Sequence, residues 1–436
     1  MKVNSSPKIR RLSVINIRAI FVSCITLVNL IYGINLQVFG QNFSTYVELS
    51  QTGKEVGILG NYLLNSNTAS AQFTNTLYKG GKLDEAIINK ASNRLGGNNR
   101  FGGDASYGLY YVQHPKRNDS ITKMGYFLAM NWKANASAEF SSDLFNWVFR
   151  GNKEYAGTKS YLGGSRFNLV TWREVKGGLM WEKKSGKNRV EFGVNLALLQ
   201  GRTLFNTRLT QLEVEMDTLG TYLDIKSRMN ASISAPNRNA YDGRAYGLAL
   251  GGFFVTEYEK GFFKFEISDL GFLNFDTKTR LISNDTLFRY QGYRFNSTQG
   301  LADSISNFFT LNSVKAKYNV RDIQNSAMLI TPAWFKIAYE FKLKKNAGLE
   351  FGVMERLAYG WFPYLYSQYR VNLTPSFNLK TRISYGGYGG LSLGLYLDKR
   401  FGNHFAIGIG SNAFEGFILP KVANGQGAYI NVRALF

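Results

Sequence analysis

Residues 428–436 read AYINVRALF, and this stretch decides the fold. Counting back in twos from Phe436 gives Ala434, Val432, Ile430 and Ala428, which are all apolar, whereas the residues between them are mostly polar or amphipathic. A period of two gives a strand one apolar and one polar face. The sequence therefore predicts a terminal β-strand whose even-numbered side chains face apolar surroundings.

A strand of this kind that ends on an aromatic residue resembles the closing strand and assembly signal of bacterial outer-membrane β-barrels. Ile430, Val432 and Phe436 would carry that signal. An edge strand in a soluble sandwich has the same pattern, so the rest of the chain must decide between the two.

Composition favours the barrel. The chain has 436 residues, of which 15% are aromatic, with 26 Tyr, 33 Phe and only 7 Pro. Aromatic rings form girdles at both interfaces of a membrane barrel. The mean hydropathy of −0.19 is too low for a bundle of membrane helices. A barrel averages polar because only every second wall residue faces lipid.

Residues 1–40 are expected to form an export signal peptide. Basic residues without any acid precede an apolar run, roughly 19–31, and Val38, Phe39 and Gly40 offer a cleavage point before Gln41. A retained membrane anchor and a lipoprotein modified at Cys24 are the alternatives.

The mature chain would then contain no cysteine, because Cys24 is the only one. Disulfides and cysteine metal sites are excluded. The formal net charge is +22. Because the basic residues are scattered through alternating strands rather than clustered, we expect no nucleic-acid partner. Contact with anionic lipid headgroups, or a cation-lined lumen, fits better.

Residues 41–105 are expected to form an amino-terminal segment, as a plug or on the periplasmic side. Helical spacing predicts a helix within 82–95 that packs on a larger body, with a partner-binding helix as the alternative. A second short helix is expected at 141–150, with Ser141 or Ser142 as its cap.

Residues 106–436 are expected to form the barrel. A hairpin is predicted at 107–133. The period-two pattern then predicts strands near 163–172, 176–184, 188–200, 203–216, 220–233, 244–257, 261–275, 332–343, 347–358, 363–373, 376–386, 389–398, 404–411 and 428–436.

The connections between these strands sort by length. Walking back from Phe436, the turns 399–403, 373–375, 343–347, 258–261, 217–220 and 184–187 fall at the same end, and all are tight. The long connections 234–243, 276–331 and 412–427 fall at the other end, although 200–203 and 386–389 at that end are short. This asymmetry is typical of membrane barrels with short periplasmic turns and long outer loops. The predicted fold class is all-β, an antiparallel transmembrane β-barrel of 14–16 strands with a few short helices.

The long outer loop 276–331 is expected to contain a lid. Leu301, Ile305, Phe308 and Phe309 recur at helical spacing, and such apolar residues need cover. A helix near 301–310 that closes the barrel mouth is predicted, with a flexible surface loop as the alternative.

Few residues of the chain are suited to catalysis or metal binding. His114 and His404, the two histidines, are expected at turns at opposite ends of the barrel. No catalytic or metal motif is present, and Ser411 near His404 has no evident orienting acid. We therefore expect no enzyme, cofactor or metal. Asp269 interrupts an apolar face, which indicates either a register change near the rim or an inward carboxylate in the lumen.

Several motifs over most of the chain after residue 100 resemble an uncharacterised family of outer-membrane barrels from Bacteroidota. They include residues 143–145, 150–152, 173–178, 192–201, 268–272 and 385–390, which read DLF, RGN, REVKGG, FGVNLALLQG, SDLGF and YGGYGG. The resemblance implies no established activity. In shape the family is similar to the long-chain fatty-acid porin group, and in distribution to the barrels around type IX secretion and gliding.

Two functions are expected for such a barrel. One is a channel or transporter for a small, hydrophobic substrate. The alternative is a structural or assembly component of an envelope complex. Expected partners are outer-membrane lipid and lipopolysaccharide, the barrel assembly machinery and other envelope proteins.

Localisation gives a first prediction. The mature chain should begin near Gln41 and fractionate with the outer membrane, because the signal pattern precedes that residue. Amino-terminal sequencing of the purified protein checks it. Recovery of Met1, or fractionation with the inner membrane, would contradict it.

Overall fold

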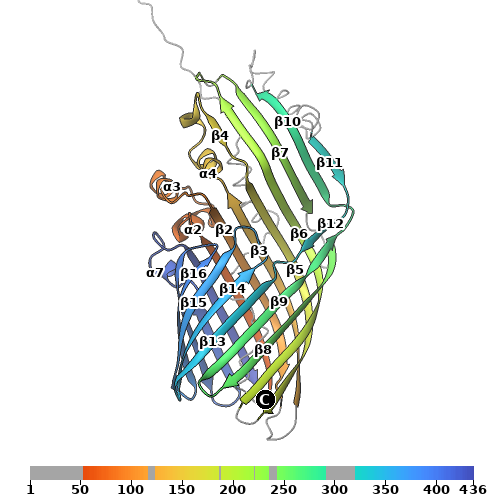
Figure 1. Cartoon of the computed structure of the whole chain (residues 1–436), viewed down its shortest axis with the longest axis vertical. Coiled ribbons are helices and arrows are strands. Elements are labelled where there is room, and N and C mark those ends of the chain that lie inside the picture. Colours follow the sequence, from red (N-terminus) through yellow and green to blue (C-terminus); the bar gives the residue numbers. More distant parts are fainter. Residues whose placement is uncertain (1–52, 116–122, 186–187, 220, 235–242, 291–319) are drawn as a thin grey trace, which may run out of the picture.

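The computed structural model describes residues 53–115, 123–185, 188–219, 221–234, 243–290 and 320–436. Their strands form one antiparallel sheet that closes on itself through the pairing of β1 (Lys54–Ser66) with β19 (Gly425–Leu435). The closed wall has 14 strands. Figure 1 shows the barrel with its tilted strands and with a part of the sheet that continues beyond one side of the rim.

The wall strands run in sequence order around the barrel. Between β1 and β19 they are β2 (Asn99–Gln113), β3 (Lys123–Phe140), β5 (Ser165–Ser185), β6 (Asn188–Met216), β8 (Ala245–Tyr258), β9 (Gly261–Phe275), β13 (Trp334–Lys344), β14 (Ala347–Arg356), β15 (Phe362–Thr374), β16 (Phe377–Gly387), β17 (Leu391–Phe401) and β18 (Phe405–Ser411). A short strand β12 (Ala327–Ile330) continues the line of β13 beside β9. We call the end that holds Phe436 and the tight turns the turn end, and the opposite end the loop end.

Side chains alternate between the two faces of the wall. On β6, for example, Val194, Leu196 and Leu198 are exposed on the outside, whereas Asn195 and Ala197 are buried inside. Outward aromatic residues gather near both ends. Those near the turn end include Tyr126, Phe192, Tyr258, Phe341, Tyr369, Phe401 and Phe405, and those near the loop end include Tyr246, Phe272, Phe362 and Tyr385. An apolar belt between aromatic girdles is the surface that a membrane barrel presents to lipid.

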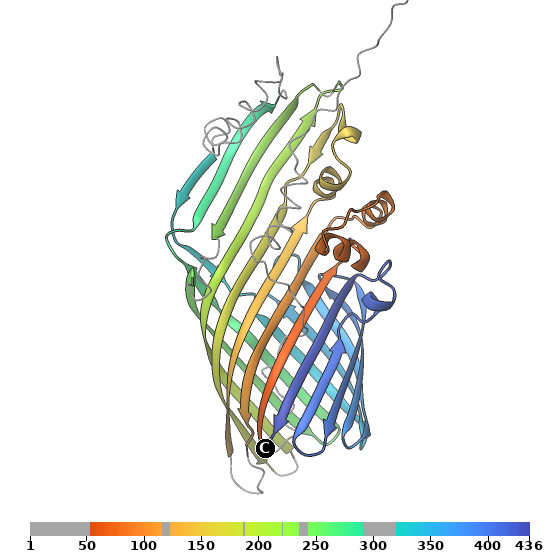
Figure 2. The same ribbon diagram turned by 180° about the vertical axis from the view of Figure 1, so that it is seen from behind.

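Beyond the loop end, one side of the wall rises into an extension. The second half of β6 pairs with β7 (Leu223–Ser234), β7 pairs with β10 (Arg280–Tyr290), and β10 pairs with β11 (Val320–Gln324). The short strand β4 (Lys159–Tyr161) pairs with the other edge of β6. Figure 2 shows this extension from behind, standing above one part of the rim only.

Helices lie at the loop end, and all except α7 are on the side of the extension. They are α2 (Ala71–Tyr78), α3 (Glu85–Ser92), α4 (Ser142–Phe149), the 3-10 helix η1 (Lys153–Tyr155) and α7 (Glu415–Ile418). The side chains of Ser70, Asp84 and Ser141 accept hydrogen bonds from the first turns of α2, α3 and α4. The helices predicted within 82–95 and at 141–150, with Ser141 as cap, are thus confirmed. No helix in the described part of the chain is long and apolar enough to cross a membrane.

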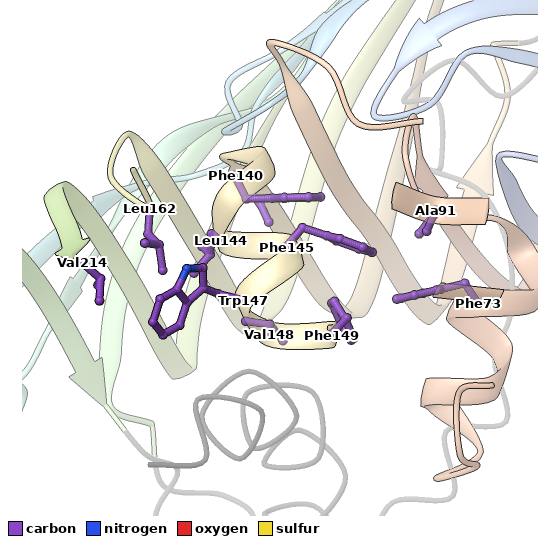
Figure 3. Close-up of a cluster of buried hydrophobic side chains, with 12 residues drawn as sticks. Phe73, Ala91, Phe140, Leu144, Phe145, Trp147, Val148, Phe149, Leu162 and Val214 are labelled. Carbon is purple, nitrogen blue, oxygen red and sulfur yellow. The ribbon is translucent and has the colours of Figure 1, made fainter. Parts of the chain in front are cut away.

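An aromatic cluster holds these helices together. The ring of Phe145 lies 4.7 Å from that of Phe149, and Phe149 lies 5.1 Å from Phe73 of α2. Figure 3 shows both α4 rings on the side that faces Phe73, and Trp147 on the other side, towards Leu162 and Val214 of the sheet. Helices α2, α3 and α4 therefore form one packed cap that lies against strands β6 and β7 of the extension.

The expected strand boundaries need three corrections. Segments 163–172 and 176–184 are one strand, β5, and segments 188–200 and 203–216 are one strand, β6. Segment 220–233 lies in the extension rather than in the wall. On β6 a bulge at Arg202, opposite Thr171 and Trp172 of β5, locally breaks the alternation and resembles a turn in the sequence.

These corrections move some turns to the other end. The turn 217–220 joins β6 to β7 at the far end of the extension, not at the turn end. Because β5 is one strand and not two, the connections before it lie at the opposite end of the barrel from the one expected. His114 follows β2 at the turn end, where its amide bonds to Gly53, and His404 lies there too.

The amino-terminal segment is also different from the expectation. Residues 54–66 form wall strand β1 and not a plug or periplasmic element. The strand was missed because Gly57, Gly60, Asn61 and Asn65 weaken its pattern. Glycine is needed at position 57, because a Cβ there would overlap the ring of Tyr110.

The segment 276–331 is not free of strands, because it contains β10, β11 and β12. The polar, irregular sequences of β10 and β11 hide their pairing, and β12 has only four residues. The expected lid residues Leu301, Ile305, Phe308 and Phe309 lie outside the described residues, as do the predicted signal peptide and Cys24.

The outer belt gives a second prediction. Leu196→Lys would place a charge halfway along an outward-facing strand, and a lysine at the bilayer midplane costs a barrel about 2–4 kcal/mol. Unfolding by urea in lipid vesicles should show that loss. Leu287→Lys is the control, because Leu287 is 74% exposed on the extension. Equal losses at both positions would contradict a lipid-facing belt.

Candidate functional site: an ion-paired layer across the lumen

The interior of the barrel is charged where a soluble sandwich would be apolar. Six inward side chains form what we call the cross-lumen cluster. It consists of Asp104 on β2, Lys133 on β3, Glu174 and Lys176 on β5, Asp269 on β9 and Arg356 on β14. Each has a side chain at most 12% exposed. The cluster lies in the loop-end half of the barrel.

Asp269 enters the lumen because the wall has a bulge at this point. The pairing of β8 with β9 shifts between Leu250 and Gly252, so that Ser268 and Asp269 oppose a single residue. Before the bulge the even-numbered Glu266 and Ser268 are buried, and beyond it Leu270 is exposed. Asp269 itself has a φ of 59° and is the only non-glycine residue with positive φ in the described ranges.

The bulge thus reconciles both expectations for Asp269. The register changes there, and the carboxylate also points inward. Aspartate tolerates the left-handed region better than most residues because its short side chain can form local bonds.

Two lysines from neighbouring strands bind this carboxylate. Lys133 Nζ lies 2.7 Å from Asp269 Oδ2, and Lys176 Nζ lies 2.9 Å from Asp269 Oδ1. Glu174 Oε1 joins the same group at 3.0 Å from Lys133 Nζ and 3.3 Å from Lys176 Nζ. The Asn131 amide also donates to Glu174, at 2.9 Å. Since β6 and β8 separate β5 from β9 in the wall, these contacts cross the lumen and do not run along the wall.

A second ion pair crosses the full width of the lumen. Arg356 Nη1 contacts Asp104 Oδ2, and β14 and β2 lie at opposite positions in the ring of 14 strands. Asn135 Nδ2 donates to Asp104 Oδ1 at 3.0 Å. A contact between opposite wall strands requires that side chains fill the interior at this level.

Aromatic residues from two loops pack against this pair. Trp361 and Tyr388 meet edge to face at 5.1 Å, and Arg356 lies 5.9 Å from the Trp361 ring. Tyr388 is 1% exposed and rests on Gly102 of β2, where a Cβ would overlap its ring. Glycine at position 102 therefore allows the loop between β16 and β17 to reach β2, although β18, β19 and β1 separate these strands in the wall.

The cluster is electrically balanced. Its three carboxylates match its two ammonium groups and one guanidinium. A buried charge is tolerated when it is paired, and leaving one unpaired is costly. The high net charge of the chain therefore resides elsewhere, and this layer gives no preference for ions of either sign.

Apolar residues face inward on both sides of the layer. Towards the turn end they include Val112, Phe127, Met180, Phe253 and Val255. Towards the loop end they include Val170, Trp172, Leu199, Leu273 and Phe275. Along β5, the inward sequence is therefore Trp172, then Glu174 and Lys176, then Met180. On this side of the wall the charged layer is a band between apolar residues. The side formed by β9, β13, β14 and β15 carries further inward ion pairs, in which Lys264 lies 2.6 Å from both Glu340 and Glu350.

The other candidate residues lie apart from this layer. Ile430 and Val432 point outward on β19, and Phe436 is 74% exposed at the turn end. Ser411 lies at the loop-end side of β18, away from His404. Among the described residues, no group of His, Cys, Asp and Glu side chains could hold a metal ion.

Five of the six cluster residues were not predicted from the sequence. The sequence holds one indication of Glu174 and Lys176. Both charged residues lie at inward positions of a strand whose Val175 is outward and 47% exposed. The partners of Asp269 could not be found in this way, since Lys133 is 136 residues distant in the chain.

The family can now be stated. The model of DUF5723, a family of unknown function, matches residues 50–410. The chain belongs to this family. The expectation of an uncharacterised barrel family is thereby confirmed, and its link to Bacteroidota stays a prediction. No curated protein matches the chain.

Solved barrels are similar to the chain in overall shape. A FadL homologue from Pseudomonas aeruginosa is 10% identical, with 88% of this chain and 90% of that chain covered and a TM-score of 0.39. The toluene transporter TodX from Pseudomonas putida is 7% identical, with coverages of 92% and 95% and a TM-score of 0.38. The translocator domain of the autotransporter NalP from Neisseria meningitidis is 9% identical, with coverages of 96% and 98% and a TM-score of 0.34.

The ion pair between opposite walls gives a third prediction. Asp104→Asn or Arg356→Gln alone leaves one buried charge unpaired, which should lower the free energy of unfolding by about 3–5 kcal/mol. The double variant should lose less than the sum of the two, and unfolding in detergent micelles measures the difference.

A matched control is the pair of Asp224 and Arg289 on the extension, whose closest atoms lie 2.7 Å apart but whose side chains are 32% and 51% exposed. Asp224→Asn and Arg289→Gln should change stability little, because water replaces the lost partner. Additive effects of the Asp104 and Arg356 substitutions would show that the two residues are not coupled.

Proposed function

We propose that this protein is a non-enzymatic barrel of the outer membrane that moves a small molecule with apolar surface through a gated interior. The turn end faces the periplasm, and the loop end with the extension faces the cell exterior. The cross-lumen cluster is the gate in this proposal.

Membrane insertion is supported by the outer surface. An apolar belt between two aromatic girdles has no stable place in water, and several wall strands have ten residues or more, which a tilted strand needs to cross a bilayer. The sorting of short turns to the end that holds Phe436 supports the orientation.

The single observation that supports a gate is the layer of ion-paired side chains across the lumen. A barrel that needs only a filled interior would gain more from apolar side chains, since buried ion pairs seldom stabilise a fold better than hydrophobic residues of similar volume. Paired charges can, however, separate at low cost once water enters, because water solvates each partner. A charged layer is therefore suited to a barrier that opens and closes.

The apolar residues on both sides of the layer support the substrate class. A molecule with apolar surface would contact Phe127, Met180 and Phe253 on the turn-end side, and Trp172, Leu199 and Leu273 on the loop-end side. On this side of the lumen, the charged band would separate these two apolar surfaces.

A second candidate function is a structural or assembly component of an envelope complex. The extension favours it, because a sheet and a packed helical cap beyond the rim exceed what a simple pore needs. The two functions differ in one measurable property, since a scaffold has no reason to open its lumen.

We further propose outer-membrane lipid and lipopolysaccharide as the surroundings of the belt. The barrel assembly machinery would recognise the terminal strand through Ile430, Val432 and Phe436. Envelope proteins would be partners of the extension, and nucleic acid would be no partner.

A fourth prediction tests the gate. Asp269→Asn removes the shared carboxylate of Lys133 and Lys176, so that like charges repel and water enters. Single-channel conductance in planar bilayers should be low for the unchanged protein and clearly higher for the variant. Combining Asp269→Asn with Lys176→Gln leaves Lys133 paired with Glu174 at 3.0 Å, so that the repulsion is removed and the conductance should return towards the closed level.

Asp224→Asn on the extension is the control, and heat-modifiable migration on a gel confirms folding of each variant. Unchanged conductance in folded Asp269→Asn protein would contradict the gate and favour the scaffold.

A further inference from the structure

The loop between β18 and β19 exposes a dense apolar surface outside the barrel. Within nine residues, Phe414, Phe417, Ile418, Leu419 and Val422 are 37%, 48%, 62%, 57% and 58% exposed. The first three of these residues follow the i, i+3, i+4 spacing that places side chains on one face of a helical turn. We call residues 414–422, which include α7, the rim patch.

The patch is held firmly rather than hanging free. The Phe414 amide donates to the Leu393 carbonyl at 2.7 Å, and the Leu393 amide donates to Glu415 Oε2 at 2.9 Å. On the other side, the amides of Ala71 and Gln72 donate to the carbonyls of Ala423 and Pro420, at 2.9 and 2.8 Å.

Glycine at position 416 fits this close attachment. A Cβ there would overlap the Gly425 carbonyl oxygen on β19. The backbone of α7 thus lies directly against the wall, and its apolar side chains are presented outward in a fixed arrangement.

The patch continues the apolar belt of the wall. Figures 1 and 2 show α7 on the outside of the barrel, beside the upper ends of the wall strands and on the side away from the extension. Its anchor strand β17 exposes Leu391 and Leu393 by 59% and 45% on the same outer surface. Lys421 is exposed between the apolar residues and supplies a cation at this level.

We propose that the rim patch inserts into the outer leaflet of the membrane, with Phe417 and Ile418 among the acyl chains and Lys421 at the headgroup phosphates. The patch then acts as an interfacial anchor that fixes the depth of this side of the barrel. Apolar patches of this kind mark interaction sites, and continuity with the lipid-facing belt favours lipid over a protein partner. This inference rests on the proposed insertion of the barrel in a membrane.

Spin labelling tests it in liposomes that contain the purified full-length protein alone. In a Cys24→Ser background, Ile418→Cys carries a nitroxide whose collisions with oxygen and with a water-soluble nickel chelate are compared. Oxygen concentrates in hydrocarbon and the chelate in water. The oxygen-to-nickel ratio at position 418 should be several-fold above that of Leu287→Cys on the extension and close to that of Leu393→Cys on β17.

The two reference labels separate the outcomes. A ratio at 418 equal to that at 287, with 393 in lipid, would overturn the inference, and a patch reserved for a protein partner would give this result. If the label at 393 were also in water, the proposed membrane insertion would fail instead. Heat-modifiable migration is checked for each labelled variant, so that an unfolded sample is not scored.

Discussion

The pairing of β1 with β19 is the contact on which the rest of the structure depends. In hydrocarbon, each unpaired backbone group costs several kcal/mol, so a sheet can cross a membrane only if it has no free edge. The register runs from Glu55 opposite Leu435 to Asn65 opposite Gly425, and two more bonds join Lys54 to Phe436 at 3.0 and 2.9 Å. The last residue of the chain is therefore part of the ladder that closes the barrel.

The seam is also held from within. The Tyr110 hydroxyl lies 2.7 Å from Glu55 Oε1 and 3.1 Å from Asn431 Oδ1, which links β2, β1 and β19. Because side chains alternate along each strand, closing the ring points half of the wall side chains into the lumen. A ring of 14 strands encloses more space than short side chains fill. Long charged residues and inward-folded loops then meet at the level of Asp104 and Arg356.

The sequence predicted those parts of the fold that depend on local pattern. The outward set on β19, the helix within 82–95 and the helix capped by Ser141 follow from spacing alone. Strand β1 was missed because Gly57 and Asn61 are chosen by neighbours across the sheet, Tyr110 and Ser106, and not by strand propensity. The extension was missed because β7 and β10 pair across a long intervening segment. Of the site, only Asp269 could be singled out, since its partners come from β3 and β5 and no local pattern records such contacts.

The position of Asp269 links the wall to the lumen. A non-glycine residue in the left-handed region carries a backbone cost of order 1–2 kcal/mol, which must be offset by other contacts. Here two lysines from the other side of the lumen hold the carboxylate, and Thr331 Oγ1 donates to the Asp269 carbonyl where β12 gives way to β13. If the lysines moved away from Asp269, the contacts that offset the backbone cost at this residue would be lost, and the bulge would then relax. The ion-paired layer and the strained wall position therefore stabilise each other, and a change in either one should alter the other. The gate proposed above would use this coupling, whereas a scaffold has no need of it.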